Sequence, residues 1–230
     1  MKTVILAGGK GLRIYEETKS KPKPMIKVGG IPLLEHIINI YTSFGFNDFI
    51  ICGGYKYKII KKHFNKPKFK NVKIVNTGLN TETGGRLFKI KKYLKNEKNF
   101  FLTYGDGLSD INLKKLLNFH NKKNKIATVT AVKKNSNFGV IRLSKNNFVE
   151  NFVEKPKKQL INGGFFVFSN KIFNFIKSNK SIEFYYLPKL TKMRNLVAFN
   201  HHGFWQCLDN SKDKKILENH LKKKNGKFNF

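Results

Sequence analysis

A glycine-dense loop directly after a short apolar strand is the feature that most constrains the fold of this chain. The apolar run covers residues 3–6, and Arg13 and Lys23 follow the loop glycines Gly8, Gly9 and Gly11. Because glycine has no Cβ, backbone N–H groups there can approach phosphate oxygens, and the two basic side chains add fixed positive charge. This order is typical of a cradle for a nucleoside triphosphate. A plain turn between strand and helix is the alternative.

Two common phosphate-binding motifs are excluded at this loop. No Gly-Lys-Ser or Gly-Lys-Thr closes it, as a Walker A motif requires. Ile14 stands where the dinucleotide-binding fingerprint needs its third glycine. What this loop binds must therefore be inferred from the other motifs of the chain as well.

Apolar strand-like runs alternate with helix-like runs along the chain, which predicts an α/β fold with a central mixed, mostly parallel sheet flanked by helices. The expected helices span 33–44, 56–64, 85–94, 112–121 and 212–224, and the expected strands after the first span 48–52, 72–75, 100–104, 127–132, 140–143 and 148–153. The last three strands predict an antiparallel extension of the sheet. With 230 residues and no linker or repeat, we expect a single domain over 1–230.

The formal net charge of +32 raises the question of nucleic-acid binding. Only four of the 46 basic residues are arginine, the residue that base and phosphate readers favour. The lysines are spread along the chain, and the accompanying excess of Asn, Ile and Phe is typical of drift in an AT-rich genome. We therefore expect no specific nucleic-acid partner.

The remaining composition points to a cytoplasmic protein with no membrane partner. The chain runs from its first residues straight into the glycine loop without a cleavable leader, and no apolar run approaches membrane-spanning length. Cys52 and Cys207 are far apart and lack CxxC spacing, which argues against a zinc site or a disulfide framework. Both are expected to be buried apolar residues.

Two aspartates are candidate metal ligands. Asp106 lies between two glycines directly after an apolar strand, and Asp209 ends the aromatic segment HHGFWQCLD. Open α/β sheets place ligands at such strand ends, and two carboxylates are the usual protein ligands of Mg²⁺ beside phosphates. A turn aspartate is the alternative for Asp106. We expect Asp110 to cap the following helix, and His201 and His202 to be core or surface residues, because adjacent strand residues point to opposite faces.

Three further segments complete the candidate site. TGGRL, residues 83–87, is a small-residue loop suited to a flat base. FVEKP offers Glu154 and Lys155, which suit a sugar hydroxyl and its phosphate, although a solvated strand end is the alternative. INGGFFVF opens a strand with Asn162 and Gly163, which allow a sugar ring to approach closely.

Taken together, these segments resemble the glucose-1-phosphate cytidylyltransferases of the sugar-nucleotide transferase family. The resemblance covers essentially the whole chain in order, and YGDGLSD, FHNKKNKIATVTAV and GFWQ are its most particular segments. It implies a single Rossmann-like nucleotidyltransferase domain. It also implies that CTP and α-D-glucose 1-phosphate give CDP-glucose and pyrophosphate with Mg²⁺, for the deoxysugars of surface polysaccharides such as O-antigen.

The resemblance also assigns roles to individual residues. Arg13 and Lys23 are implied to be catalytic. The same two residues are implied to bind the nucleotide and its triphosphate together with Leu6, Ala7, Gly8, Gly9 and Gly11. The implied cytosine-binding residues are Thr83, Gly84, Gly85 and Arg86, and the implied metal ligands are Asp106 and Asp209. The implied sugar-phosphate-binding residues are Glu154, Lys155, Asn162 and Gly163.

The chain departs from the family pattern at three places. Leu12 stands where threonine is usual, Cys207 stands where proline is usual, and the segment between Phe64 and Val72 is much shorter. The last difference removes surface that relatives use to associate, so we expect a small homo-oligomer, a dimer or trimer. Two alternatives remain: a transferase for another nucleotide or sugar 1-phosphate, and a catalytically silent regulatory homologue.

Overall fold

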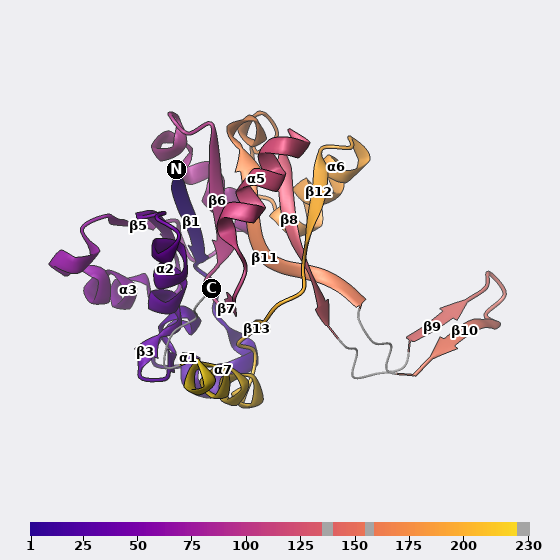
Figure 1. Cartoon of the computed structure of the whole chain (residues 1–230), viewed down its shortest axis with the longest axis horizontal. Helices are drawn as coiled ribbons and strands as arrows, with labels where there is room; N and C mark the ends of the chain where they lie inside the picture. The colour runs from indigo at the N-terminus through magenta and orange to yellow at the C-terminus, as the bar shows by residue number, and fades with distance from the viewer. Residues whose placement is uncertain (135–139, 155–158, 225–230) are drawn as a thin grey trace.

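A seven-stranded mixed sheet forms the centre of the protein, described here by a computed structural model for residues 1–134, 140–154 and 159–224 (Figure 1). The strand order is β12-β8-β11-β6-β1-β4-β5. In chain order the strands are β1 (Lys2–Ala7), β4 (Asp48–Gly53), β5 (Val72–Asn76), β6 (Asn99–Tyr104), β8 (Ala127–Lys134), β11 (Gln159–Ser169) and β12 (Leu196–His201). Within the described residues, β11 is the one strand of this sheet that pairs antiparallel with its neighbours. The predicted mixed, mostly parallel α/β sheet is confirmed.

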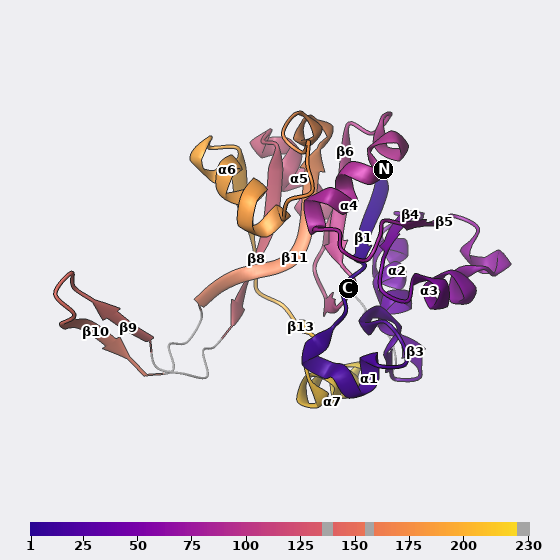
Figure 2. The ribbon, with the colours of Figure 1, turned by 180° about the vertical axis from the view of Figure 1, so that it is seen from behind.

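Helices cover both faces of this sheet because successive strand residues point to opposite faces. Ile5 belongs to the apolar cluster with α2 (Leu33–Ser43), α3 (Tyr57–Phe64) and α5 (Leu113–Lys123). Its neighbour Val4 belongs to the cluster on the other face, with α4 (Thr83–Lys89) and α6 (Leu187–Lys192). Figure 1 shows α5 in front of the sheet, and Figure 2, from behind, shows α4 and α6. None of the described helices is long and apolar enough to cross a membrane.

Several short elements frame the carboxyl ends of the strands. Next to the glycine loop lie the 3₁₀ turn Leu12–Ile14, α1 (Tyr15–Thr18) and the 3₁₀ turn Lys23–Met25. Two short strands, β7 (Gly107–Ser109) and β13 (Trp205–Cys207), pair antiparallel and bring the C-terminal part of the chain against the end of β6. The ribbon β2 (Lys27–Val28) and β3 (Ile31–Pro32) precedes α2, and α7 (Ser211–Lys223) closes the described chain.

The prediction that residues 140–143 and 148–153 extend the central sheet is wrong. They form β9 (Val140–Leu143) and β10 (Val149–Val153), which pair with each other as a hairpin. Figures 1 and 2 both show this hairpin projecting away from the sheet. Local sequence indicates an extended backbone but not the pairing partner, and apolar side chains of the hairpin, such as Phe148 and Phe152, are exposed.

The prediction of one helix over 85–94 also needs correction. The helix α4 begins at Thr83 and ends at Lys89, and a separate 3₁₀ turn covers Lys91–Leu94. Leu87, Ile90 and Leu94 are all fully buried, so the apolar pattern is the same for a continuous helix and for this broken one. The TGGRL segment is therefore the first turn of α4 and not a loop before it.

The glycines of α4 generate a prediction about stability. A Cβ built on Gly84 would lie 2.4 Å from the backbone oxygen of Lys180 and 2.5 Å from Cε2 of Tyr186. Replacing a helical glycine by alanine usually stabilises a helix by up to ~1 kcal/mol. Here we expect Gly84→Ala to lower the free energy of unfolding by about 1 to 3 kcal/mol, because the backbone must shift. Urea denaturation measures the difference, and a higher midpoint for the variant would contradict this packing.

Candidate active site

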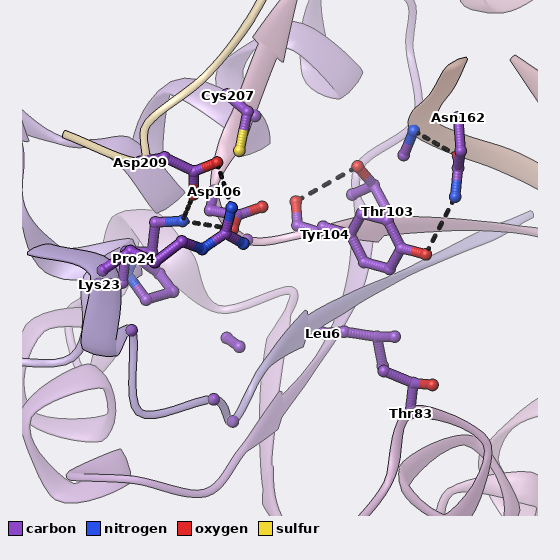
Figure 3. A pocket seen from close by; sticks show the side chains of 18 of the residues that line it. Leu6, Lys23, Pro24, Thr83, Thr103, Tyr104, Asp106, Asn162, Cys207 and Asp209 are labelled. Atoms are coloured by element: carbon purple, nitrogen blue, oxygen red, sulfur yellow. Dashed lines mark hydrogen bonds and ion pairs between the residues drawn. The ribbon is translucent and has the colours of Figure 1, made fainter. Parts of the chain in front are cut away.

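An open cavity of about 720 Å³ lies at the carboxyl ends of β1 and β6. Four separate parts of the chain line it: the segment from Leu6 through the glycine loop, the start of α4, the turn after β6, and the C-terminal stretch around Asp209. Part of β11 forms a further wall. Figure 3 shows the labelled side chains around this space. Open α/β sheets place ligands at this edge, so the cavity is the candidate active site.

The backbone of the glycine loop is held by Arg86, which the family resemblance assigned to the base. Arg86 is buried, and its guanidinium donates to the backbone oxygens of Gly8 at 3.1 Å, Gly53 at 3.3 Å and Gly78 at 2.8 Å. It also donates to the Thr77 hydroxyl at 2.7 Å. Burial lowers the pKa of Arg86, which the nearby Cys52 and Glu82 oppose. These bonds fix the loop to the strands beside it.

The same arginine explains why Gly8 carries no side chain. A Cβ on Gly8 would lie 2.0 Å from the Nη1 atom of Arg86, closer than any non-bonded contact allows. The loop backbone therefore lies directly on the guanidinium. This leaves the opposite side of the loop facing the cavity, which Gly8, Gly9 and Gly11 all line.

Lys23 joins the two predicted metal ligands. Its Nζ atom lies 2.7 Å from Oδ2 of Asp106 and 2.7 Å from Oδ1 of Asp209. Arg13 Nη1 lies 2.7 Å from the other carboxylate oxygen of Asp209. The Lys23 side chain is only 8% exposed, whereas that of Arg13 is 76% exposed. The structure thus brings together four residues that the sequence selected from three distant segments. Figure 3 labels three of them, Lys23, Asp106 and Asp209.

The charges of this cluster stabilise one another. Burial alone would lower the pKa of Lys23, but the charge of Asp106 and the hydrogen bonds to both carboxylates raise it above its usual value. Burial alone would raise the pKa of Asp209, but the hydrogen bond from Lys23 and the charges of Lys23 and Arg13 lower it. Both groups are therefore held in their charged forms at neutral pH.

The donor set of this cluster suits a hard divalent cation. Ligand atoms of Asp106, Cys207 and Asp209 all lie within 4.8 Å of one another. Burial and the two carboxylates raise the pKa of the Cys207 thiol, so the sulfur stays protonated and is a poor ligand. The Lys23 ammonium already lies between the carboxylates as a cation. Two carboxylate oxygens beside an open cavity fit an oxygen-preferring ion better than zinc.

The other side of the cavity carries several neutral hydrogen-bonding groups, and Glu82, Arg86 and Lys134 also line the cavity. Asn162 donates through Nδ2 to the Tyr104 hydroxyl at 3.3 Å, and its Oδ1 accepts from the N–H of Gly164 at 2.8 Å. The Trp205 ring N–H donates to the backbone oxygen of Gly163 at 2.7 Å. Leu6, Ala7, Thr83, Asn162 and Gly163 all line the cavity.

Some predicted site residues are not brought to the cavity. Glu154 is exposed at the end of β10 and does not line it, and Lys155 lies outside the described residues. Gly84 and Gly85 lie within α4, where they pack against Lys180 and Asn179 and do not line the cavity. The hairpin position of Glu154 follows from the pairing of β9 with β10, which local sequence does not determine.

The prediction that Asp110 caps α5 is wrong. Asn112 is the cap, since its side chain accepts from the N–H of Lys115 at 2.9 Å. Asp110 instead lies 3.0 Å from Nε2 of His201, which makes His201 a structural partner. Both Asp and Asn are good caps, so composition alone could not separate two positions so close together.

Sequence reasoning did not select Tyr104 or Glu183. Tyr104 donates to a Glu183 oxygen at 2.5 Å and lines the cavity. Its place at the end of a strand, directly before Gly105 and Asp106, is a signal that could have identified it. Glu183 lies in a one-turn π-helix, Ile182–Tyr186, far from any recognisable motif, and local sequence gives no signal for it.

Known proteins resemble this chain over nearly its whole length. The family profile described as nucleotidyl transferase matches residues 2–213. A glucose-1-phosphate cytidylyltransferase from Salmonella typhi is 40% identical in an alignment that covers 95% of each chain, and one from Salmonella typhimurium matches to the same extent. The solved UDP-glucose pyrophosphorylase complexed with UDP-glucose superposes with a TM-score of 0.76 over 97% of this chain and 98% of that one. At 18% identity, this last likeness supports the fold alone.

The lowered pKa of Asp209 generates a prediction about acid stability. A carboxyl whose pKa is lower in the folded chain stabilises the fold above its ordinary value of 3.8, and that contribution is lost as the pH falls through the lowered pKa. The wild type should therefore lose more stability than Asp209→Asn between about pH 5 and about pH 2. Urea midpoints across this range measure the difference. The exposed Glu150→Gln is the control, and parallel curves for wild type and Asp209→Asn would contradict the prediction.

Proposed function

The chain belongs to the nucleotidyl transferase family, and from this premise we propose that it transfers CMP from CTP to α-D-glucose 1-phosphate, giving CDP-glucose and pyrophosphate. The observation that carries the proposal is the 40% identity to glucose-1-phosphate cytidylyltransferases across 95% of the chain. The cavity supports it, because one end carries a glycine loop and paired charges and the other end carries neutral hydrogen-bonding groups.

The proposed chemistry is an in-line displacement at phosphorus. An oxygen of the sugar phosphate forms a bond to the α-phosphorus of CTP, and the bond from that phosphorus to the bridging oxygen breaks. Pyrophosphate leaves with the electron pair. The nucleophile is already an anion, so no general base is required, and catalysis consists of positioning and of neutralising charge.

Lys23 and Arg13 are the proposed catalytic residues. The buried Lys23 lies at the point where the carboxylates meet, so a phosphate that reaches this point comes within range of its ammonium. The exposed Arg13 side chain can turn from Asp209 toward the cavity. Backbone N–H groups from Gly8 to Gly11 would bind the triphosphate, while Leu6 and Ala7 would lie beside the nucleotide.

Asp106 and Asp209 would hold Mg²⁺, which when bound supplies positive charge to phosphate oxygens. Asn162 and Gly163 are proposed to contact the sugar phosphate from the opposite wall. Glu154 and Lys155 are also proposed to contact the sugar phosphate, and this part of the proposal rests only on the family resemblance. Thr83 is proposed to contact the base directly, whereas Arg86 is proposed to position the loop, because its donors are used by backbone oxygens.

The proposed setting is the cytoplasm, where nucleoside triphosphates are available. The product, a nucleotide-activated hexose, suits the class of reactions that make deoxysugars for surface polysaccharides such as O-antigen.

A panel of nucleotides and sugar 1-phosphates tests the proposal. We expect CTP with glucose 1-phosphate to give the highest kcat/KM, measured as pyrophosphate released by the full chain. Another nucleotide exceeding CTP by about tenfold would refute the cytidylyl assignment while leaving nucleotidyl transfer intact. An inactive protein across the whole panel would support the alternative of a silent homologue.

The two carboxylates should act as one unit. Asp106→Asn and Asp209→Asn are each expected to remove most of the activity, and the double variant should be little worse than either single variant, because groups that hold one ion are not additive. Mn²⁺ binding, measured by electron paramagnetic resonance, should weaken in the same three variants. Fully additive losses, or unchanged Mn²⁺ binding, would refute a shared metal site.

Association with copies of the same chain is also part of the proposal. Exposed apolar side chains on the β9–β10 hairpin support it, among them Ile141, Phe148 and Phe152. The net charge of +32 opposes association through self-repulsion, which favours a small assembly. Light scattering of the full chain should give a dimer or trimer, and a monomer or hexamer would contradict the expectation.

A further inference from the structure

Glu183, a carboxylate outside the predicted site, joins two hydroxyl groups that line the cavity. The Tyr104 hydroxyl donates to its Oε1 atom at 2.5 Å, and the Thr83 hydroxyl donates to its Oε2 atom at 2.6 Å. Figure 3 shows Thr83 and Tyr104 on the cavity wall. The three residues come from different segments, so the fold and not the local sequence creates this arrangement.

Further hydrogen bonds hold the Glu183 carboxylate in place. The Ser181 hydroxyl also donates to Oε2, at 2.6 Å, and itself accepts from the backbone N–H groups of Glu183 and Phe184 at 3.1 Å each. Both carboxylate oxygens are therefore engaged by donors. The carboxylate cannot turn away without breaking several bonds at once.

These contacts determine where the hydroxyl protons lie. An ionised carboxylate accepts hydrogen bonds and donates none, so the single protons of Thr83 and Tyr104 are both directed at Glu183. Burial, and then the charge of Glu183, raise the pKa of Tyr104, which keeps its proton. The Thr83 oxygen additionally accepts from the N–H of Ile182 at 2.7 Å. Toward the cavity, these hydroxyls can only accept.

The orientation of Asn162 agrees with this assignment. Because the Tyr104 proton points at Glu183, its oxygen is available to accept, and Asn162 donates to it through Nδ2. The other end of the same amide accepts from the Gly164 N–H. Both contacts select the same orientation of the amide.

The hydroxyls lie at the end of the cavity where a base would be placed. Figure 3 shows Lys23, Asp106 and Asp209 on one side of the cavity, with Thr83 and Asn162 on the other and Leu6 between them. A nucleotide whose phosphates lie against Lys23 would extend its base toward the side that carries Thr83 and Asn162, where the edge of the base would come close to Thr83.

We propose that Glu183 fixes the Thr83 hydroxyl as a hydrogen-bond acceptor toward the cavity and the Tyr104 hydroxyl as the acceptor of Asn162, so that this end selects a base edge carrying an amino group, as in cytosine, over one carrying a carbonyl oxygen, as in uracil. The inference rests on the proposed function and deepens it by naming a positioning residue for base selection. An acceptor facing the cytosine amino group forms a hydrogen bond. The same acceptor facing the uracil carbonyl leaves two lone pairs opposed and unsatisfied.

Glu183→Gln tests the proposal in the full chain. A glutamine amide has one accepting oxygen and one donating NH₂ group, so at least one of the two hydroxyls must direct its proton away from residue 183 and toward the cavity or Asn162. We expect the ratio of kcat/KM for CTP to that for UTP, with glucose 1-phosphate, to fall at least about tenfold. Part of this fall should come from a higher kcat/KM for UTP, which a purely structural loss would not produce.

A second variant and a control complete the experiment. Thr83→Val keeps the side-chain volume but removes the acceptor. We therefore expect kcat/KM for CTP to fall about tenfold, with no rise in kcat/KM for UTP. Glu150→Gln, on the exposed hairpin, should leave the ratio unchanged, and melting temperatures show that each variant is folded. A wild type that prefers a nucleotide other than CTP refutes the proposed function. A wild type that prefers CTP, with ratios unchanged in Glu183→Gln and Thr83→Val, overturns the role of Glu183 alone.

Discussion

The contact of the Lys23 ammonium with two carboxylates is the interaction on which the cavity depends. Asp106 follows β6 and Asp209 follows β13, so each carboxylate belongs to a different part of the chain. Two carboxylates this close repel each other unless a cation lies between them. Lys23 supplies that cation in the free protein, and in doing so it ties the segment after the glycine loop to the turn after β6 and to the C-terminal stretch. The same balance of charge is consistent with the proposed binding of a divalent ion and of phosphates.

A second buried cation, Arg86, determines the shape of the loop above the cavity. It donates to backbone oxygens of Gly8, Gly53 and Gly78, which come from three different connections at the carboxyl edge of the sheet. Lys23 and Arg86 thus have different tasks. Lys23 holds two carboxylates together, and Arg86 holds the backbone of the glycine loop against the neighbouring strands. Loss of Arg86 would remove its donor from the Gly78 oxygen and weaken the hold on Gly8 and Gly53, whose oxygens also accept from the Tyr55 N–H and from Thr77.

Much of this arrangement could be predicted from the sequence, because the chemistry is concentrated at strand ends. The alternation of strands and helices gives a mostly parallel sheet with Asp106 at its carboxyl edge, and the pairing of β13 with β7 brings Asp209 to the same place beside Lys23. The pairing of β9 with β10 could not be predicted, because strand propensity does not name a partner. The roles of Arg86 and Glu183 could not be predicted either. A buried arginine that binds carbonyl oxygens has the same local sequence as one that binds a base, and Glu183 acts through contacts that only the tertiary fold creates.

The most direct measurement of the central claim is a crystal structure of the full chain with Mn²⁺ and a non-hydrolysable CTP analogue. Anomalous scattering locates the ion independently of the coordinates of the protein. We expect one strong peak coordinated by carboxylate oxygens of both Asp106 and Asp209, with Lys23 Nζ hydrogen-bonded to a phosphate of the analogue and the triphosphate against the glycine loop. A nucleotide bound elsewhere, or an ion that neither carboxylate touches while Lys23 still joins them, would contradict it.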